Sequence, residues 1–327
     1  MDVDEFFFTF MDKIETMIKG TREEQVMQNL FQGFIAHELI CKGCPHYSET
    51  KEPFLAVSLD VKNKNSVLDS LKFYVEGDML EGDNAYYCEK CEKKVNTLKR
   101  ACIKRMPNTL FLVLKRFEFD FDRMCKVKVN DYCEFPNELD MAPFSQQELA
   151  RQDLIRKMEE KSMAVEDLSE DELFIYQRKV PASYYQYKLK GIVVHLGTAD
   201  QGHYYSFIQA REGKSQKWYE FNDTFVKEFD PAFIPEEAFG GEDHGVSSNI
   251  SEMQAQNPSR DDQAVIQAMQ QFKTKIKNAY VLIYDRVETY DMEKVNDLLD
   301  DAKIMGKPEE DIDKLWANCR VSSQQIS

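Results

Sequence analysis

The first stretch of the chain repeats its apolar positions with the period of a helix. Apolar side chains recur there at spacings of three and four residues, namely Phe6, Phe7, Phe10, Met11, Ile14 and Ile18. This spacing is typical of an amphipathic helix, and Asp2 with Glu5 three residues later resembles a capping arrangement. We therefore expect a helix near the start of the chain whose phenylalanines belong to the core.

From about residue 31 to 106 the apolar positions alternate with polar ones instead. The clearest case is the set Leu55, Val57, Leu59 and Val61. A period of two predicts short strands with one buried face. The run from 110 to 114 is continuously apolar, which is typical of a strand covered on both faces, so we interpret it as a central strand.

The stretch from 144 to 183 is charged rather than apolar. Residues 151–180 carry six basic and eight acidic side chains, and we interpret the stretch as a charged helical insertion without a catalytic role. Strand signals return at 187–195, 204–208, 218–221 and 280–284. A stretch rich in Gly, Ser, Asn and Gln at 241–270 separates the last two signals and predicts a long mobile loop.

The last forty or so residues show the helical period twice. One stripe consists of Val295, Leu298, Leu299 and Ala302, and after Gly306 and Pro308 a second consists of Ile312, Leu315, Trp316 and Cys319. We expect a helical C-terminal extension over residues 287–327.

Composition narrows the class of protein. The 327 residues are 43% hydrophobic and 12% aromatic, which suffices for a large core and excludes a disordered chain. The formal net charge of −16 would repel nucleic acid and anionic membranes, so we expect neither as a partner. The sequence has no apolar run of about 18 residues and no basic leader. We therefore expect a monomer in the cytoplasm, with the nucleus as a second location.

The cysteines suggest a metal site. Cys41 and Cys44 form one Cys-x-x-Cys pair, and Cys88 and Cys91 form another. Eight cysteines in a chain this long are too few for a disulfide scaffold. Two such pairs would complete the tetrahedral ligand set of a structural Zn²⁺, and His46 is an alternative ligand for one sulfur. Two unrelated pairs of buried thiols, or a redox site, are the other interpretations.

One histidine stands where a catalytic base would. His203 follows the turn residues 200–202 and begins an apolar strand, so its ring can lie at the edge of a cleft. Asn222 or Asp223, which close a neighbouring strand, would accept the proton of Nδ1 and leave Nε2 free to take a proton. His195 is the closest competitor, but its apolar strand favours a packed, hydrogen-bonded ring.

These segments together resemble the catalytic domain of the ubiquitin-specific proteases. The latter part of the glutamine box, the Leu-Lys-Arg-Phe box, the histidine box and the closing strand of that family are matched in order by residues 2–7, 114–117, 202–205 and 278–284. The segment 221–223 matches the site of the third catalytic member, and the four paired cysteines match the zinc-binding fingers. The agreement covers about residues 1 to 286. Segments 80–86 and 135–141 look most like the very large, fat-facets-like branch.

The resemblance implies an α+β fold of the papain-like ubiquitin-specific protease type, truncated at its N-terminus. A helical thumb, a mixed palm and β-rich fingers at about 31–106 would make up a catalytic domain over residues 1–286. It also implies hydrolysis of isopeptide bonds at the C-terminus of ubiquitin, with ubiquitin and ubiquitinated proteins as partners. In that chemistry His203 would hold a cysteine as thiolate and later protonate the leaving amine, while Asn222 orients the ring and Asp223 is the second choice.

The sequence departs from the family at its start. The family's cysteine box lies upstream of the glutamine box, and this sequence begins inside the glutamine box. We therefore expect a fragment whose nucleophile lies upstream and which is inactive alone. The remaining cysteines are expected to pack as small apolar groups, namely Cys102, Cys125, Cys133 and Cys319. The alternatives are a catalytically inactive ubiquitin-binding module and, third, a zinc-stabilised scaffold without ubiquitin contact.

Overall fold

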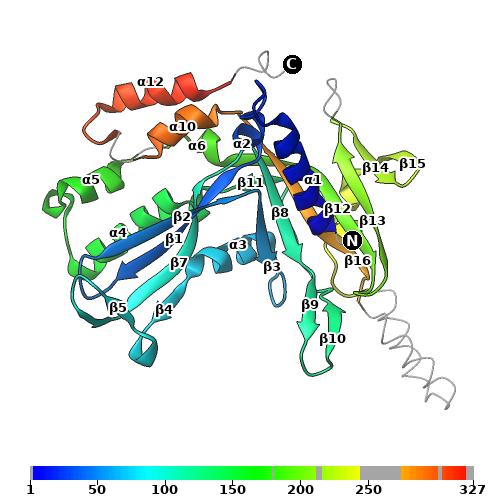
Figure 1. Cartoon of the computed structure of the whole chain (residues 1–327), viewed down its shortest axis with the longest axis horizontal. Helices are drawn as coiled ribbons and strands as arrows, with labels where there is room; N and C mark the ends of the chain where they lie inside the picture. Colours follow the sequence, from blue (N-terminus) through cyan, green and yellow to red (C-terminus); the bar gives the residue numbers. More distant parts are fainter. Residues whose placement is uncertain (1–2, 179, 211–215, 244–273, 301–303, 322–327) are drawn as a thin grey trace.

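The structure, a computed structural model, describes residues 3–178, 180–210, 216–243, 274–300 and 304–321. Helices and strands are mixed along the chain. Figure 1 shows a large sheet, a smaller sheet that extends away from it, and helices gathered around both. The two sheets are described first, because they carry the candidate site.

The large sheet is mixed and eight-stranded. Its strands follow the spatial order β15-β14-β13-β12-β16-β8-β3, with β11 pairing beside β12. Only β3 and β8 run parallel. The bounds are β3 Ala56–Asp60, β8 Thr109–Lys115, β11 Glu138–Asp140, β12 Gln186–Gly197, β13 Gly202–Gln209, β14 Trp218–Asn222, β15 Phe225–Phe229 and β16 Lys277–Arg286.

Strand β8 lies inside this sheet, between β16 and β3. Five of its seven residues are buried, and only Phe111 and Lys115 are not. Side chains on both faces are therefore removed from water, which is why its sequence is continuously apolar rather than alternating. The prediction of a central strand is confirmed.

The smaller sheet has the order β2-β1-β7-β4. Its strands are β1 Gly33–Cys41, β2 Tyr47–Phe54, β4 Asp78–Leu80 and β7 Thr97–Arg105, and a separate hairpin joins β5 Tyr86–Cys88 to β6 Lys93–Val95. We call this sheet with its hairpin the finger region. Strands are thus present between 31 and 106 as predicted, mostly as antiparallel pairs of the finger region. The expectation that the whole range belongs to the fingers is wrong for Val57 and Leu59, because β3 pairs parallel with β8 at the edge of the large sheet.

Helix α3, Val67–Glu76, connects the two sheets by contacting both β3 and β7. The Ser66 side chain accepts a hydrogen bond from the backbone of Asp69 and so caps its first turn. The chain leaves the helix at Gly77, where φ is +75° and a Cβ would lie 2.5 Å from the Cβ of Arg100. Only glycine fits this close approach to the finger sheet.

A two-stranded hairpin follows β8 directly and stands apart from the large sheet. It consists of β9 Phe117–Asp120 and β10 Cys125–Lys128. Figure 1 shows it at the lower edge of the molecule, pointing away from the helices. Its tip carries the exposed side chains Phe121 and Met124.

Helix α1, Val3–Ile18, covers one part of the large sheet. The Phe7 ring packs 4.6 Å from the Phe111 ring of β8, and Met11 is buried. However, Phe6 and Phe10 are about half exposed, at 54% and 50%. The expectation that both belong to the core is wrong, because among the described residues only one side of this helix is covered.

The charged stretch from 144 to 183 folds largely into helices. It contains α4 Gln146–Lys161, η3 Val165–Asp167, α5 Glu170–Gln177 and the first half of α6 Ala182–Tyr185, and the short η2 Ala142–Phe144 leads into it. Leu154 is the one buried residue of α4. Charge holds the helix in place instead: buried Arg100 of β7 contacts Glu38 at 2.6 Å and Asp153 of α4 at 2.8 Å. The insertion is thereby fixed to the finger region.

The C-terminal stripes form α10 Met292–Leu298 and α12 Glu309–Cys319. Val295 and Leu298 are buried, and Trp316 lies 5.3 Å from the ring of Tyr184. These residues belong to the same hydrophobic cluster as the large sheet. Ala302 of the predicted first stripe lies outside the described residues.

The remaining described helices are short: α2 Val26–Leu30, η1 Gly82–Asn84, η4 Pro231–Phe233 and α7 Ile234–Ala238. The loop predicted at 241–270 lies, from residue 244 onward, outside the described residues. Within the described part of the chain, no helix has the length and apolar character needed to cross a membrane.

Candidate active site and metal centre

His203 is held at the start of β13 by a tight turn. Gly197, the last residue of β12, has φ +130°, and the backbone N–H of Thr198 donates to the carbonyl of Gln201 at 2.8 Å. The next residue, Gly202, lies so close to His195 that a Cβ would be 2.0 Å from its Nε2. Glycine is therefore required directly before His203.

Asn222 meets His203 from the neighbouring strand. The Nε2 atom of His203 lies 2.7 Å from Oδ1 of Asn222, the last residue of β14. The amide is oriented by a second hydrogen bond, in which its Nδ2 donates to Glu220 at 3.3 Å. The two predicted residues thus lie side by side. The nitrogen differs from the prediction: Nε2 faces the amide, so Nδ1 is the ring atom left for proton transfer.

Asp223 is less well placed than Asn222. Its carboxylate lies 3.8 Å from Nε2 of His203, and its side chain is 75% exposed. The backbone of Asp223 has φ +51°, the left-handed conformation of a turn, because the chain reverses there into β15. A shorter contact and less solvent favour Asn222 as the group that orients the ring.

His195 has the environment of a packed residue. It is 4% exposed, and its ring lies 5.1 Å from Phe117 and 4.8 Å from Tyr204. Its ring also packs against the backbone of Gly202, where a Cβ would lie 2.0 Å from Nε2 of His195. The packing expected of His195 is present, and its structural role stays a prediction.

A cleft of about 580 Å³ opens beside this turn. One wall is the β9–β10 hairpin, with Phe117, Glu118 and Lys126, and the other is the turn with Asp200 and Gln201. Sequence reasoning missed the hairpin wall. The available signal was the pair of exposed aromatic residues at positions 119 and 121, which a buried strand would not carry. A larger cavity, of about 800 Å³ between α4 and the finger sheet, shares none of these lining residues.

The four paired cysteines converge in the finger region. Cys41 ends β1 and Cys88 ends β5, so two hairpins bring the Cys-x-x-Cys pairs together. The sulfurs of Cys44 and Cys88 are 3.7 Å apart. Four sulfurs at about 2.3 Å from a tetrahedral Zn²⁺ are separated by about 3.8 Å, so this spacing fits the metal.

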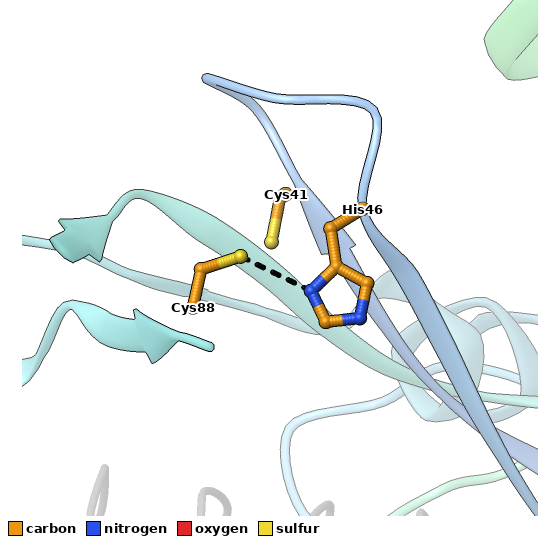
Figure 2. Close-up of side chains that lie close together, drawn as sticks. All are labelled: Cys41, His46 and Cys88. Atoms are coloured by element: carbon orange, nitrogen blue, oxygen red, sulfur yellow. Dashed lines mark hydrogen bonds between the residues drawn. The ribbon is translucent and has the colours of Figure 1, made fainter. Parts of the chain in front are cut away.

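His46 is a fifth donor in the same cluster. Figure 2 shows its Nδ1 directed at the sulfur of Cys88, at 3.1 Å, with Cys41 beside them. The ligand atoms of Cys41, His46 and Cys88 lie within 4.8 Å of one another, as do those of Cys44, Cys88 and Cys91. Cys88 belongs to both triads, so four sulfurs and one imidazole nitrogen are available as ligands to a single ion near it.

The thiols of the cluster change one another's pKa. The backbone N–H of His46 lowers the pKa of Cys44, whereas the hydrogen bond to Cys44 raises the pKa of Cys91 to about 11. The cause is that one thiolate opposes the formation of a second beside it. A divalent cation would reverse this effect and hold all four as thiolates, and the donor set therefore fits a metal.

The other four cysteines lie elsewhere. Cys102, Cys133 and Cys319 are buried, and Cys125 is exposed on β10. Burial raises the pKa of Cys133 to about 11, which makes its thiol a poor nucleophile. Within the described part of the chain, no cysteine sulfur is hydrogen-bonded to the ring of His203.

Comparison with known proteins gives matches over most of the chain. The sequence profile named ubiquitin carboxyl-terminal hydrolase matches residues 1–284. Human ubiquitin carboxyl-terminal hydrolase 9Y is 35% identical over 296 residues, which covers 89% of this chain and 11% of the relative. The Drosophila melanogaster protein named probable ubiquitin carboxyl-terminal hydrolase FAF is 37% identical over 295 residues, covering 88% and 10%. The chain thus spans about a tenth of the length of these relatives.

A solved structure shares the fold. One chain of the SAGA Ubp8/Sgf11/Sus1/Sgf73 DUB module bound to ubiquitin aldehyde superposes with a TM-score of 0.57 at 22% sequence identity. The match covers 87% of this chain and 49% of that chain. At this level of identity, the likeness concerns the fold.

Proposed function

The chain belongs to the ubiquitin carboxyl-terminal hydrolase family, and on that premise we propose that it is the larger part of a deubiquitinase catalytic domain. The α+β fold expected from the resemblance, with palm and fingers, is confirmed by the structure and its match. The proposed reaction is thiol-dependent hydrolysis of isopeptide bonds at the C-terminus of ubiquitin. The hydrogen bond between His203 and Asn222 is the observation that carries this proposal, and the turn that lines the cleft leads directly into His203.

The nucleophile, in this proposal, is a cysteine supplied by a segment outside the 327 residues. None of the chain's own cysteines is hydrogen-bonded to the His203 ring within the described residues. The incoming sulfur would give its proton to Nδ1 of His203, since Nε2 is engaged by Asn222. The imidazolium keeps the sulfur as thiolate, and Asn222 stabilises the imidazolium because its Oδ1 accepts the hydrogen bond that Nε2–H donates.

The chemical steps follow from this proton position. The thiolate attacks the carbonyl carbon of the last glycine of ubiquitin, and the bond from that carbon to the lysine nitrogen breaks. His203 returns its proton to the leaving lysine amine. Water then attacks the thioester and His203 takes one of its protons. The bond from carbon to sulfur breaks with the electron pair on sulfur, and the carboxylic acid that forms gives its remaining proton to solvent. Atoms and charge balance without a further co-reactant.

The metal of the finger region is proposed to be structural Zn²⁺. The support is the 3.7 Å separation of the Cys44 and Cys88 sulfurs and the convergence of both pairs. Four protein ligands leave no open position for a water nucleophile, so the ion would stabilise the fold and take no part in the reaction. Cys41, Cys44, Cys88 and Cys91 are the preferred set, with His46 as the alternative to one sulfur.

Ubiquitin and ubiquitinated proteins are the proposed partners. The related DUB module was solved with ubiquitin aldehyde bound, and the cleft between the β9–β10 hairpin and the turn 198–202 would admit an extended tail. The net charge of −16 supports the absence of nucleic acid and anionic lipid from this list. We keep a monomeric state and a cytoplasmic location, with the nucleus as the alternative, as part of the same proposal.

A test of the proposal uses the chain extended by a family segment that carries the cysteine. In that protein, His203→Ala should reduce reaction with a ubiquitin C-terminal electrophile by at least about a thousandfold, because the thiol loses its base. His195→Ala is the matched control and should retain far more activity, measured by the rate of covalent adduct formation. Equal losses in the two variants would show that the wrong histidine has been assigned.

A catalytically inactive ubiquitin-binding module is the second candidate. It is favoured by the same finding that no described cysteine is hydrogen-bonded to His203. The reading frame that precedes Met1 in the genome separates the two candidates. A cysteine box in frame supports the enzyme, whereas a stop codon directly before Met1 supports the binding module.

A further inference from the structure

Lys128 joins the two walls of the cleft. It is the last residue of β10, so it belongs to the hairpin wall, and its side chain is part-buried. From there its ammonium group reaches the opposite wall, where β12 ends and the turn toward His203 begins.

The contacts of Lys128 are all to backbone carbonyls. Its Nζ lies 3.0 Å from the carbonyl oxygen of His195, 3.2 Å from that of Gly197 and 2.6 Å from that of Ile276. Ile276 directly precedes β16, and its carbonyl also accepts the backbone N–H of Gly197 at 3.0 Å. One side chain therefore ties together the hairpin, the end of β12 and the start of β16.

The number of donors matches the number of acceptors. An ammonium group has three N–H donors, and three carbonyls surround it. The charged group nearest to it is Arg116, whose guanidinium is likewise bound to backbone carbonyls, those of Ala279, Val129 and Asp131. Burial, with a smaller contribution from Arg116, lowers the pKa of Lys128 to about 7. A neutral amine has only two donors, so one carbonyl loses its partner when Lys128 is deprotonated.

The turn that Lys128 holds is the one that places His203. Gly197 accepts from Lys128 through its carbonyl and begins the turn closed by Thr198 and Gln201. The turn leads directly into Gly202 and His203 at the start of β13. Movement of the Gly197 carbonyl would thus change both the width of the cleft and the direction of the His203 backbone.

We propose that Lys128 is a positioning residue, which fixes the β9–β10 hairpin against the 197–202 turn and so sets the cleft for the extended C-terminal tail of ubiquitin. The nature of the ligand rests on the proposed function. The positioning of the turn rests only on the contacts above. Lys128 does not touch the reacting atoms and acts through the backbone of residues 195–197 and 276.

The first test separates tail recognition from general binding. The dissociation constant of the chain is measured for intact ubiquitin and for ubiquitin without its C-terminal tail. The value for tailless ubiquitin divided by the value for intact ubiquitin gives the tail-dependent ratio, which is compared among variants. Lys128→Met should reduce this ratio about tenfold, because three hydrogen bonds that shape the tail path are lost. Lys128→Arg keeps charge and donors and should restore most of it. Lys161→Met, at an exposed lysine on α4, is the control and should leave the ratio unchanged.

The second test needs no ubiquitin. Backbone amide exchange at 197–203 should accelerate at least about tenfold in Lys128→Met, while the amides of Ile192 and Val194 in the middle of β12 stay unchanged. If wild-type chain fails to bind ubiquitin but this local acceleration appears, the proposed function is wrong and the positioning role stands. Unchanged exchange at 197–203 in a folded Lys128→Met variant would overturn the positioning role.

A pH series gives a readout that packing alone would not move. The tail-dependent ratio of the wild type should fall as pH rises from 6 to 8.5, because Lys128 loses a donor through its lowered pKa. Lys128→Arg stays charged over this range and should lack that fall. An identical fall in both proteins would assign the pH dependence to groups other than Lys128 and contradict the inference.

Discussion

At the scale of the residue, the account depends on how an amide selects one nitrogen of an imidazole. Asn222 is itself oriented by Glu220, so its carbonyl oxygen faces Nε2 of His203. The sequence predicted this pair but not the nitrogen, because the choice depends on the direction from which β14 approaches the ring. That direction follows from strand pairing and is not encoded in the spacing of residues 203 and 222.

The geometry makes a prediction about the two candidate orienting residues. In the chain extended by the cysteine segment, Asn222→Ala should lower the rate of adduct formation about ten- to a hundredfold, because the ring loses its 2.7 Å partner. Asp223→Ala is the neighbouring control and should lower it less than threefold, since its carboxylate is exposed and 3.8 Å away. A larger loss in Asp223→Ala would mean that the carboxylate, not the amide, orients His203.

At the scale of the element, strands were easier to predict than the surfaces they present. The continuous run in β8 and the alternation in β3 predicted their elements correctly, because burial on two faces or one determines those patterns directly. The phenylalanines of α1 were assigned to the core by period alone, yet Phe6 and Phe10 are half exposed. Period indicates which side is apolar, and only the neighbouring elements decide whether that side is covered.

The finger region supplies a prediction about metal removal. Its local hydrophobic cluster is small and centres on Cys41, Cys88 and Val95, with few apolar side chains around them. A structural Zn²⁺ contributes on the order of 10 kcal/mol to such a site, so a strong chelator should unfold the β5–β6 hairpin and lower the melting temperature. Cys44→Ser should reproduce the effect, whereas Cys125→Ser, at the exposed cysteine outside the cluster, should not. Thermal stability that is unchanged by chelation would contradict the zinc assignment.

At the scale of the whole molecule, distant segments combine into one core. An aromatic group joins three distant segments, with ring centroids 5.3 to 6.0 Å apart. It consists of Tyr184 from α6, Trp316 from α12, and Tyr290, which precedes α10. The sequence predicted the two C-terminal helices from their stripes but treated them as an extension. Their burial in the cluster of the large sheet was not predictable, because it depends on which surface the sheet leaves open.

The arrangement of the whole molecule also explains which residues of the site could be predicted from the sequence. His203, Asn222 and the cysteine pairs were found from their residue types and order, supported by the resemblance to a family. The β9–β10 wall and Lys128 were not, because a lysine bound to three carbonyls has no local signature. Its role appears only when β10, β12 and β16 are brought together.

The most direct measurement of the central claim is a titration of the isotope-labelled chain with unlabelled ubiquitin, followed by backbone amide shifts. The account predicts shifts at the turn 198–201, at His203 and along β9–β10, which weaken when ubiquitin lacks its C-terminal tail. Spectra without any change at saturating ubiquitin, or shifts confined to α4 and α12, would contradict the claim that this cleft receives the end of ubiquitin.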